Sequence, residues 1–262
     1  MIGCHVDSTD PVGDAVGRGA QVAQVLLGDP QKWTSPVVEY PGGAGALRDA
    51  AEEAGVALVV HSPYLLNVAS TNNRVRIPSR QLLQKTVMLA AEIGAFGVVV
   101  HGGHVGEEDD PSAGVENWFK VVDGLEFPVP IFIENTAGGA RAMARTLDAW
   151  RTLWAGISEA AGAPHVGVCL DTCHAHAAGL DLHTVAADLR AITGRIDLVH
   201  ANDSRDAAGS GADRHANLGQ GTIDSDALIA AVRDARAPAL VETPGGAAAQ
   251  AADIAWLRQH LG

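Results

Sequence analysis

Eight short runs of apolar, mostly β-branched residues recur along the 262-residue chain, and a segment of helical character follows each run. The runs lie at residues 2–6, 22–27, 56–61, 97–101, 130–134, 166–171, 196–200 and 239–242. Short apolar runs bounded by glycine or proline indicate buried strands, and eight successive strand–helix units are typical of a parallel (β/α)8 barrel. We therefore predict an α/β fold with one domain over residues 1–262, a TIM barrel whose active site lies at the C-terminal face of the strands.

The helices are predicted at residues 13–20, 45–54, 79–93, 113–123, 140–160, 182–192, 225–235 and 248–261. A doubly wound open sheet is the alternative, but such a sheet normally has fewer strands and a glycine-rich first turn, which this chain lacks. Hydrophobic residues make up 47% of the sequence, so the chain can bury a core of the size that a barrel requires.

Six of the predicted strands end on a residue type that binds metal ions. These residues are His61, His101, Glu134, Asp171, His200 and Glu242. The C-terminal ends of parallel barrel strands meet at one face, so the six side chains are expected to converge. One histidine after a strand is more often a hydrogen-bonded structural residue, but six buried polar endings would be costly without shared partners. The pattern predicts a metal centre.

Two further segments supply the other candidate ligands. His174 follows Asp171 by three residues, in the stretch VGVCLDTCHAHAAG. Asp213 and His215 lie two residues apart in a glycine-rich loop, so an extended backbone would direct both to one side and Arg214 toward solvent or a phosphate. Alone, the two segments would favour a helix cap and a solvated charged loop. With the strand ends they make nine ligands, and because one zinc takes about four, two or three metal ions are predicted.

The formal net charge is −13, from 18 Lys and Arg against 31 Asp and Glu, and by itself it argues against a nucleic-acid partner. Bound metal ions would change the charge locally. Three divalent cations add six positive charges and would bring the formal charge to −7, with the whole change at the barrel mouth. Such a multi-metal site clamps a phosphoryl group and supplies a hydroxide nucleophile near neutral pH.

At these residues the sequence resembles the endonuclease IV family of apurinic/apyrimidinic endonucleases. The matching stretches are HSPYLLNVAS (61–70), VVVHGGH (98–104), IENTAGG (133–139), GVCLDTCHAHAAG (167–179), HANDS (200–204), DRHANLGQG (213–221) and VETPG (241–245). The resemblance implies a (β/α)8 barrel with three Zn²⁺ ions, with Mn²⁺ as an alternative at one or more sites. It implies three ligand sets: His61, His101 and Glu134; Glu134, Asp171, His200 and Glu242; and His174, Asp213 and His215.

The resemblance also implies a function. Enzymes of this family cut the DNA backbone 5′ to abasic sites, leave a 3′-hydroxyl, and remove 3′-blocking groups. Glu134 would bridge two metal ions and act as the catalytic residue, with a metal-held hydroxide attacking phosphorus. Asn135 and Thr136 follow Glu134 directly, and we expect them to hydrogen-bond its carboxylate or a phosphate oxygen. The expected partner is damaged double-stranded DNA, and the protein is expected to be a monomer.

Four residues are predicted to contact DNA. Tyr64 matches a side chain that penetrates DNA in this family, although an aromatic cover over the barrel top is the alternative. The loop after the second strand contains Gln31, Lys32 and Trp33, and Gln31 stands where the family has an arginine. Lys32 is expected to replace this contact only in part, because an ammonium group lacks the planar geometry of a guanidinium group. Arg214 completes the predicted set.

Two other functions remain as alternatives. A sugar isomerase or epimerase also uses a barrel with His and carboxylate ligands, but it needs one or two metal ions and a base that shuttles a proton, so nine ligands fit it poorly. A non-enzymatic module for damaged DNA would hold structural zinc, which favours closed sites with cysteine. Outside the ligand set, His5 is expected beside the ligands or as a buried hydrogen-bonded histidine. The basic run at residues 74–80 is predicted to be a solvated helix start rather than a phosphate contact.

The cysteines and the terminus suggest the compartment. Cys4, Cys169 and Cys173 form no C-x-x-C pair, and we expect free thiols, buried for Cys4 and Cys169. The N-terminal residues lack the basic and long apolar segments of a signal peptide, and no run of about 18 apolar residues is present. We therefore expect a soluble cytoplasmic protein without a membrane partner.

Overall fold

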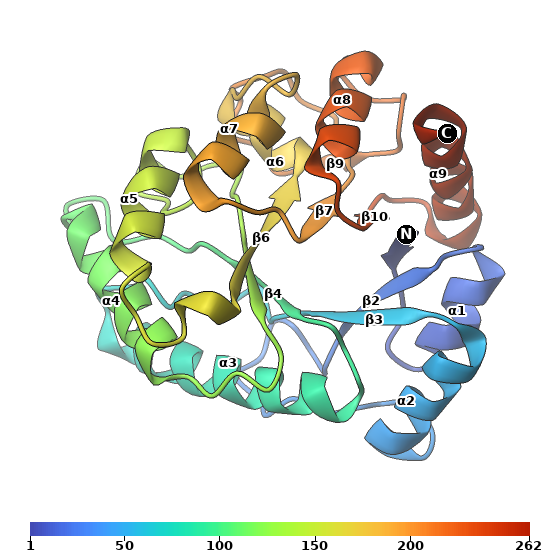
Figure 1. Cartoon of the computed structure of the whole chain (residues 1–262), viewed down its shortest axis with the longest axis horizontal. Helices are drawn as coiled ribbons and strands as arrows, with labels where there is room; N and C mark the ends of the chain where they lie inside the picture. The colour runs from blue at the N-terminus through green and yellow to red at the C-terminus, as the bar shows by residue number, and fades with distance from the viewer.

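Eight strands pair in parallel around a closed barrel in the computed structural model, which describes residues 1–262 (Figure 1). The strands are β1 (Ile2–His5), β2 (Val22–Leu26), β3 (Ala57–His61), β4 (Val98–His101), β5 (Ile131–Glu134), β6 (Val166–Asp171), β7 (Leu198–His200) and β10 (Ala239–Val241). Their order around the barrel is β1-β10-β7-β6-β5-β4-β3-β2, and β1 pairs with both β10 and β2, which closes the ring. The predicted (β/α)8 barrel is confirmed.

Helices surround the barrel (Figure 1). They are α1 (Pro11–Gly17), α2 (Gly43–Ala54), α3 (Asn73–Glu92), α4 (Pro111–Gly124), α5 (Leu147–Ile157), α6 (Thr172–Ala178), α7 (Val185–Thr193), α8 (Ser225–Ala235) and α9 (Gly246–Leu261), with a short 3-10 helix at Ala163–His165. The short helix α6 and the antiparallel pair β8 (Asp203–Ser204) and β9 (His215–Ala216) were not predicted. None of the helices combines the length and the apolar composition that crossing a membrane requires.

Two helix boundaries differ clearly from the prediction. Helix α3 begins at Asn73 and not at residue 79, because the side chain of Asn72 accepts a hydrogen bond from the backbone N–H of Arg74 and caps the helix. Pro78 lies in the second turn of α3, where it cannot donate the backbone hydrogen bond that another residue would make to the carbonyl of Arg74. Helix α5 begins later than residue 140, at Leu147, where the hydroxyl of Thr146 caps it.

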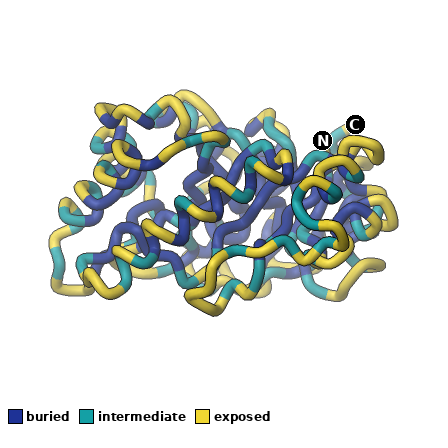
Figure 2. Tube along the Cα trace, turned by 90° about the horizontal axis from the view of Figure 1, so that it is seen from below, coloured by how far each residue is buried: buried dark blue, intermediate teal, exposed yellow.

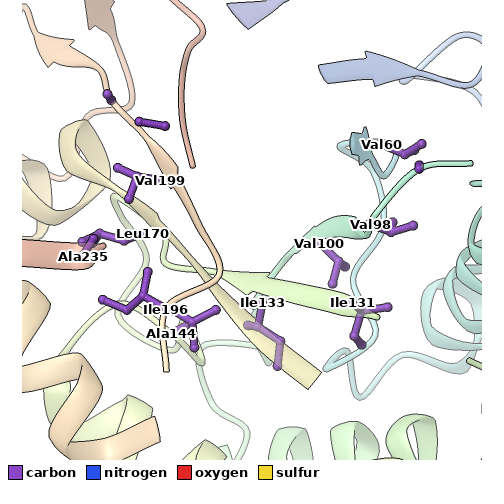
Figure 3. Packing of buried hydrophobic residues seen from close by; sticks show 14 of the residues in the cluster. Val60, Val98, Val100, Ile131, Ile133, Ala144, Leu170, Ile196, Val199 and Ala235 are labelled. Carbon is purple, nitrogen blue, oxygen red and sulfur yellow. The ribbon is translucent and has the colours of Figure 1, made fainter. Parts of the chain in front are cut away.

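Successive residues of each strand alternate between two cores. Outward-facing residues pack beneath the helices, among them Val60, Val98, Val100, Ile131, Ile133, Leu170 and Val199 (Figure 3). Inward-facing residues fill the barrel; they are Val22, Val59, Val99, Phe132, Cys169, Leu198 and Leu240. Because side chains alternate in a strand, the residue two positions beyond each inward-facing residue also points into the barrel. This register directs all six strand-end ligand candidates to the interior.

Burial follows the same layers. In Figure 2 the buried parts of the trace run through the middle of the molecule, and the exposed parts lie on the outer turns and loops. Cys4, Cys169 and Cys173 are buried free thiols; the predicted burial of Cys4 and Cys169 is confirmed. Burial raises the pKa of both Cys169 and Cys173 to about 12, so both thiols are protonated at neutral pH.

Candidate metal centre

The nine predicted ligand side chains converge at the C-terminal ends of the strands. They form three groups, and within each group one potential ligand atom per residue lies within 4.8 Å of the others. The groups are His61, His101 and Glu134; Glu134, Asp171, His200 and Glu242; and His174, Asp213 and His215. Strands and the residue directly after β10 supply the first two groups, while α6, β9 and the loop before β9 supply the third. The structure thus brings together the sets that the resemblance implies, and their role as ligands stays a prediction.

Glu134 belongs to two of these groups, and its two carboxylate oxygens face different histidines. Oε1 lies 2.8 Å from Nδ1 of His200, while Oε2 lies 3.2 Å from Nε2 of His61 and 3.2 Å from Nε2 of His101. Burial opposes ionisation of Glu134, but the imidazole groups of His200 and His101 outweigh it and hold the pKa well below its ordinary value. An ionised carboxylate therefore lies between the first and second groups.

The third group contains two histidine nitrogens directed at one carboxylate. Oδ1 of Asp213 lies 3.1 Å from Nε2 of His174 and 3.2 Å from Nε2 of His215, yet neither nitrogen makes a hydrogen bond. Burial opposes protonation of His174, but the charges of Asp171, Asp213 and Glu134 outweigh it and raise the pKa to about 10. Burial likewise opposes protonation of His215, and Asp213 and Asp171 raise its pKa to about 9. Two imidazole nitrogens that face one carboxylate without a hydrogen bond fit a cation bound between them.

Backbone carbonyl groups determine which ring nitrogen is available in three of the histidines. The pairs are His61 Nδ1 with the oxygen of Ser62 at 2.7 Å, His174 Nδ1 with that of Asn135 at 2.9 Å, and His215 Nδ1 with that of Glu242 at 3.4 Å. A carbonyl oxygen can only accept, so each Nδ1 must carry a proton. In the neutral ring Nε2 then has the free lone pair, and in all three residues Nε2 faces carboxylates. This is the arrangement that metal-binding histidines require.

Gln24 on β2 holds two of the candidate ligands and was not predicted. Its side-chain Nε2 donates to Oε1 of Glu242 at 2.6 Å, so its Oε1 accepts from Nε2 of His200 at 2.8 Å. Nδ1 of His200 is thereby left for a metal ion. His5 also lies beside this amide, with Nδ1 3.3 Å from Nε2 of Gln24, and burial lowers its pKa to about 4. The signal for Gln24 was in the sequence, because it is two residues beyond the inward-facing Val22.

Two asparagines position the backbone and side chains of the second group. Asn202 donates to Oδ2 of Asp171 at 2.7 Å and accepts from the backbone N–H of Glu242 at 2.8 Å. Asn135 accepts from the backbone N–H of Asp171 at 2.7 Å and donates to its carbonyl at 2.9 Å. Of the two partners expected for Asn135, the carboxylate of Glu134 was therefore wrong, and a phosphate oxygen stays a prediction. Adjacent strand-end side chains point in opposite directions, so Asn135 reaches the neighbouring strand.

The comparisons with known proteins identify the family. Residues 14–260 match the family model described as xylose isomerase-like TIM barrel. A Mycobacterium bovis protein named probable endonuclease 4 is 51% identical over 262 residues, which cover 100% of this chain and 99% of the relative. The chain belongs to the endonuclease IV family. As a member, it is an enzyme, a hydrolase of the nuclease class.

Solved structures agree with membership in the endonuclease IV family. Endonuclease IV from Thermus thermophilus superposes with a TM-score of 0.84 and 29% identity, covering 99% of this chain and 98% of that one. A D-tagatose 3-epimerase-like protein has a TM-score of 0.76 and 20% identity, covering 99% and 97% of the two chains. At that identity the likeness is one of fold alone.

Tyr64 lies above the first group in this endonuclease IV family member. Its ring centroid is 5.1 Å from that of His61 and 6.2 Å from that of His101, and the ring is about half exposed. Burial and the charges of Glu242 and Glu134 raise the pKa of Tyr64 to about 12, so the phenol is neutral. Tyr64 thus lies at the mouth of the barrel, where it can contact a molecule bound at the candidate metal centre.

The other predicted DNA contacts lie on exposed loops. Lys32 and Gln31 are exposed in the loop between β2 and α2, and Nζ of Lys32 lies 2.8 Å from Oδ2 of Asp29. Arg214 is exposed, and its Nε donates to Oδ2 of Asp206 at 2.8 Å. These cations are accessible, but each already has a carboxylate partner.

Two cavities at the mouth adjoin the candidate ligands. One of about 380 Å³ is lined by Tyr64, His101 and the backbone around Gly138. The other, of about 350 Å³, is lined by Asp213, His215 and Glu242 together with Arg205 and Arg214. The candidate metal centre is therefore open to a bound molecule and not closed like a structural zinc site.

Proposed function

We propose that this endonuclease IV family member is a DNA-repair enzyme that cuts the phosphodiester bond 5′ to abasic sites and leaves a 3′-hydroxyl. We also propose that it removes 3′-blocking groups, and that one domain over residues 1–262 performs both reactions. The observation that supports this most strongly is the convergence of nine imidazole and carboxylate side chains in three groups at an open barrel mouth. The relative's name, probable endonuclease 4, supports the same reaction class.

The donors fit three zinc ions, with manganese as an alternative. Each group offers three or four nitrogen and oxygen donors, the usual number for zinc when an open position is kept for water or substrate. The Nε2 atoms of His174 and His215 are buried and make no hydrogen bond, and this supports the third ion, because buried polar atoms are normally satisfied. Bound there, the ions would activate water and neutralise charge on the phosphate.

The protein's own side chains have distinct roles in this proposal. Glu134 faces two groups with its two oxygens, and its place at the end of the rigid strand β5 keeps those oxygens fixed. Gln24 and Asn202 hold the carboxylates and imidazole around it, so that ligand orientation is set before substrate arrives. The scissile phosphate would lie at the mouth, against the three groups.

Four residues would position the DNA around that phosphate. Tyr64 is proposed to contact the damaged nucleotide, because its half-exposed ring lies over His61 at the mouth. Lys32, Gln31 and Arg214 are proposed to contact the backbone. The two cations would have to exchange Asp29 and Asp206 for phosphates. Contacts to phosphates would hold the DNA in register on the enzyme and would take no part in the cleavage step.

The test combines metal analysis with two substrates. We expect three zinc ions per purified chain, scission of an abasic duplex, and a new 3′ end that a DNA polymerase extends. An undamaged duplex is the control, and a keto sugar such as D-tagatose tests for epimerase activity. An epimerised sugar, or binding of abasic DNA without scission by the metal-loaded protein, would refute the proposed reaction.

A further inference from the structure

A large groove lies on the outer wall of the molecule, away from the candidate metal centre. It lies between α3 and α4 and has a volume of about 790 Å³, within the range of about 300–1,000 Å³ that is usual for ligand sites. None of its lining residues is among the candidate metal ligands or DNA contacts. The nuclease reaction therefore gives no reason for this groove.

Four cations line the groove and no carboxylate does. Arg76, Arg80 and Lys85 come from α3, and Lys120 comes from α4. Only Lys120 has an ion-pair partner, Glu116 on its own helix at 3.6 Å, a distance that makes the pair weak. In a chain where acidic side chains outnumber basic ones by 31 to 18, three cations without a carboxylate partner along one groove form a local positive surface.

The remaining contacts of these cations are with neutral groups. Lys85 donates to the hydroxyl of Ser35 at 3.0 Å, and Arg76 donates to the side-chain oxygen of Asn73. The guanidinium group of Arg80 lies beside Gly124, at the C-terminal end of α4. Arg76, Arg80 and Lys85 therefore have no carboxylate partner.

The groove also has an apolar part. Ile77 is 50% exposed on the face that α3 turns to the groove, and Val121 and Leu125 lie at its floor. No aromatic side chain lines it, so it lacks the stacking platform that binds single-stranded nucleic acid. The helix bodies and not their N-termini line most of it, so it lacks the backbone N–H groups that cradle a free phosphate.

We propose that this groove binds an acidic peptide segment of a partner protein, with aliphatic or aromatic side chains on Ile77 and the apolar floor and carboxylates on Arg76, Arg80, Lys85 and Lys120. The supporting observation is charge complementarity, because the groove combines apolar surface with four cations, three of which lack a carboxylate partner. The interaction is separate from the proposed cleavage of DNA and would bring the enzyme to a partner.

The experiment uses the full-length, metal-loaded protein and a fluorescein-labelled peptide with three repeats of Asp-Leu-Asp-Phe. We expect saturable binding at protein concentrations below about 1 mM, measured by fluorescence anisotropy and weakened by salt. Two control peptides replace Asp by Asn, or Leu and Phe by Ser, and both should bind more weakly. Equal binding of either control peptide would overturn the proposal.

Variants locate the site. The double variant Arg80→Glu, Lys120→Glu should weaken peptide binding about tenfold or more, which corresponds to about 1.4 kcal/mol. Ile77→Ser should also weaken it and removes only an exposed side chain, so it keeps the test valid if the double variant unfolds. Arg151→Glu, on the exposed surface of α5, is the matched control and should bind like the parent.

Two further measurements distinguish peptide binding from an effect on DNA cleavage and from binding of phosphate or nucleic acid. Cleavage of an abasic duplex should be unchanged in all of these variants, because none lies at the metal centre. Tripolyphosphate and a short oligothymidylate serve as competitors, and displacement of the peptide by either at equal charge concentration would show a phosphate or nucleic-acid site instead. Binding that is the same in the double variant and in Arg151→Glu would also overturn the assignment.

Discussion

Gln24 and His200 are joined by a hydrogen bond of 2.8 Å across the inside of the barrel. They lie on β2 and β7, which are not neighbours, since β1 and β10 separate them around the ring. The same amide donates to Glu242, so its orientation is determined: its nitrogen faces the carboxylate and its oxygen faces the imidazole. One neutral side chain therefore sets which nitrogen of His200 remains for a metal ion.

Replacing Gln24 should weaken the binding of the second metal ion without unfolding the barrel. Gln24→Ala removes the acceptor of His200 and the donor of Glu242, and we expect a loss of about 10- to 100-fold in metal affinity, the usual effect of removing a group that orients a ligand. Competition with a chromophoric chelator measures it. Gln259→Ala, an exposed glutamine on α9, is the control, and equal metal retention in the two variants would contradict this role.

Glu134→Gln should stop cleavage while the barrel still folds. The substitution keeps the shape of the side chain but removes the charge that faces two ligand groups at once. We expect single-turnover cleavage of an abasic duplex to fall by roughly 10²- to 10³-fold, the scale of losing one group that stabilises charge in the transition state. Metal content should fall with it, and DNA binding should fall much less. Glu52→Gln changes an exposed glutamate and is the control. A cleavage rate of Glu134→Gln close to that of this control would show that Glu134 does not organise the reaction.

Removing the metal ions should lower stability and activity together. Without cations, Glu134, Asp171, Glu242 and Asp213 repel one another, and ions that bind only the folded state stabilise it. Chelation should lower the Tm by about 5 °C or more, because one kcal/mol shifts the Tm of a chain of this size by about 2–4 °C. Re-addition of zinc should restore both. An unchanged Tm after metal analysis has verified complete removal would contradict the proposed site.

The metal-free protein should lose stability as the pH rises above neutral. The pKa values of His174 and His215 are raised from 6.5 to about 10 and about 9. Because the folded values exceed the unfolded one, protonation stabilises the fold fully below pH 6.5, and this contribution is lost as the pH rises through about 9 and then about 10. Melting of the chelated protein from about pH 6 to about pH 10 measures it. His215→Asn should flatten the profile, whereas His183→Asn should match the parent; a chelated parent as flat as His215→Asn would contradict the prediction.

Tyr64→Ala and Lys32→Ala should weaken binding of abasic DNA and leave the metal content intact. Tyr64 lies over the first group but is no ligand, and Lys32 lies on an exposed loop. Lys32→Ala should also reduce the slope of log K against log salt by about one, as expected for one lost phosphate contact. Titration of a labelled abasic duplex at several salt concentrations measures both effects. Affinity equal to that of Arg151→Ala would remove these residues from the DNA surface.

Much of this molecule was determined locally and could be predicted from the sequence. Eight apolar runs with helices between them predicted the barrel, and strand β6 and helix α8 were predicted to the residue at Val166–Asp171 and Ser225–Ala235. The strand ends predicted the ligands for a simple reason. Side chains alternate along a strand, and parallel strands end at one face, so a polar residue at each end must point into a shared mouth.

Only the tertiary structure decided which partners these residues have. Asn135 follows Glu134 in the chain but bonds the backbone of Asp171 on the next strand, and Gln24 reaches His200 from 176 residues away. Register across a barrel, and not proximity in the chain, sets such distances. The basic run at residues 74–80 likewise indicates only a solvated helix until α4 is placed beside it. A hydrogen bond or a groove is formed by two segments that the fold brings together. The sequence pattern of one segment does not show which other segment lies beside it.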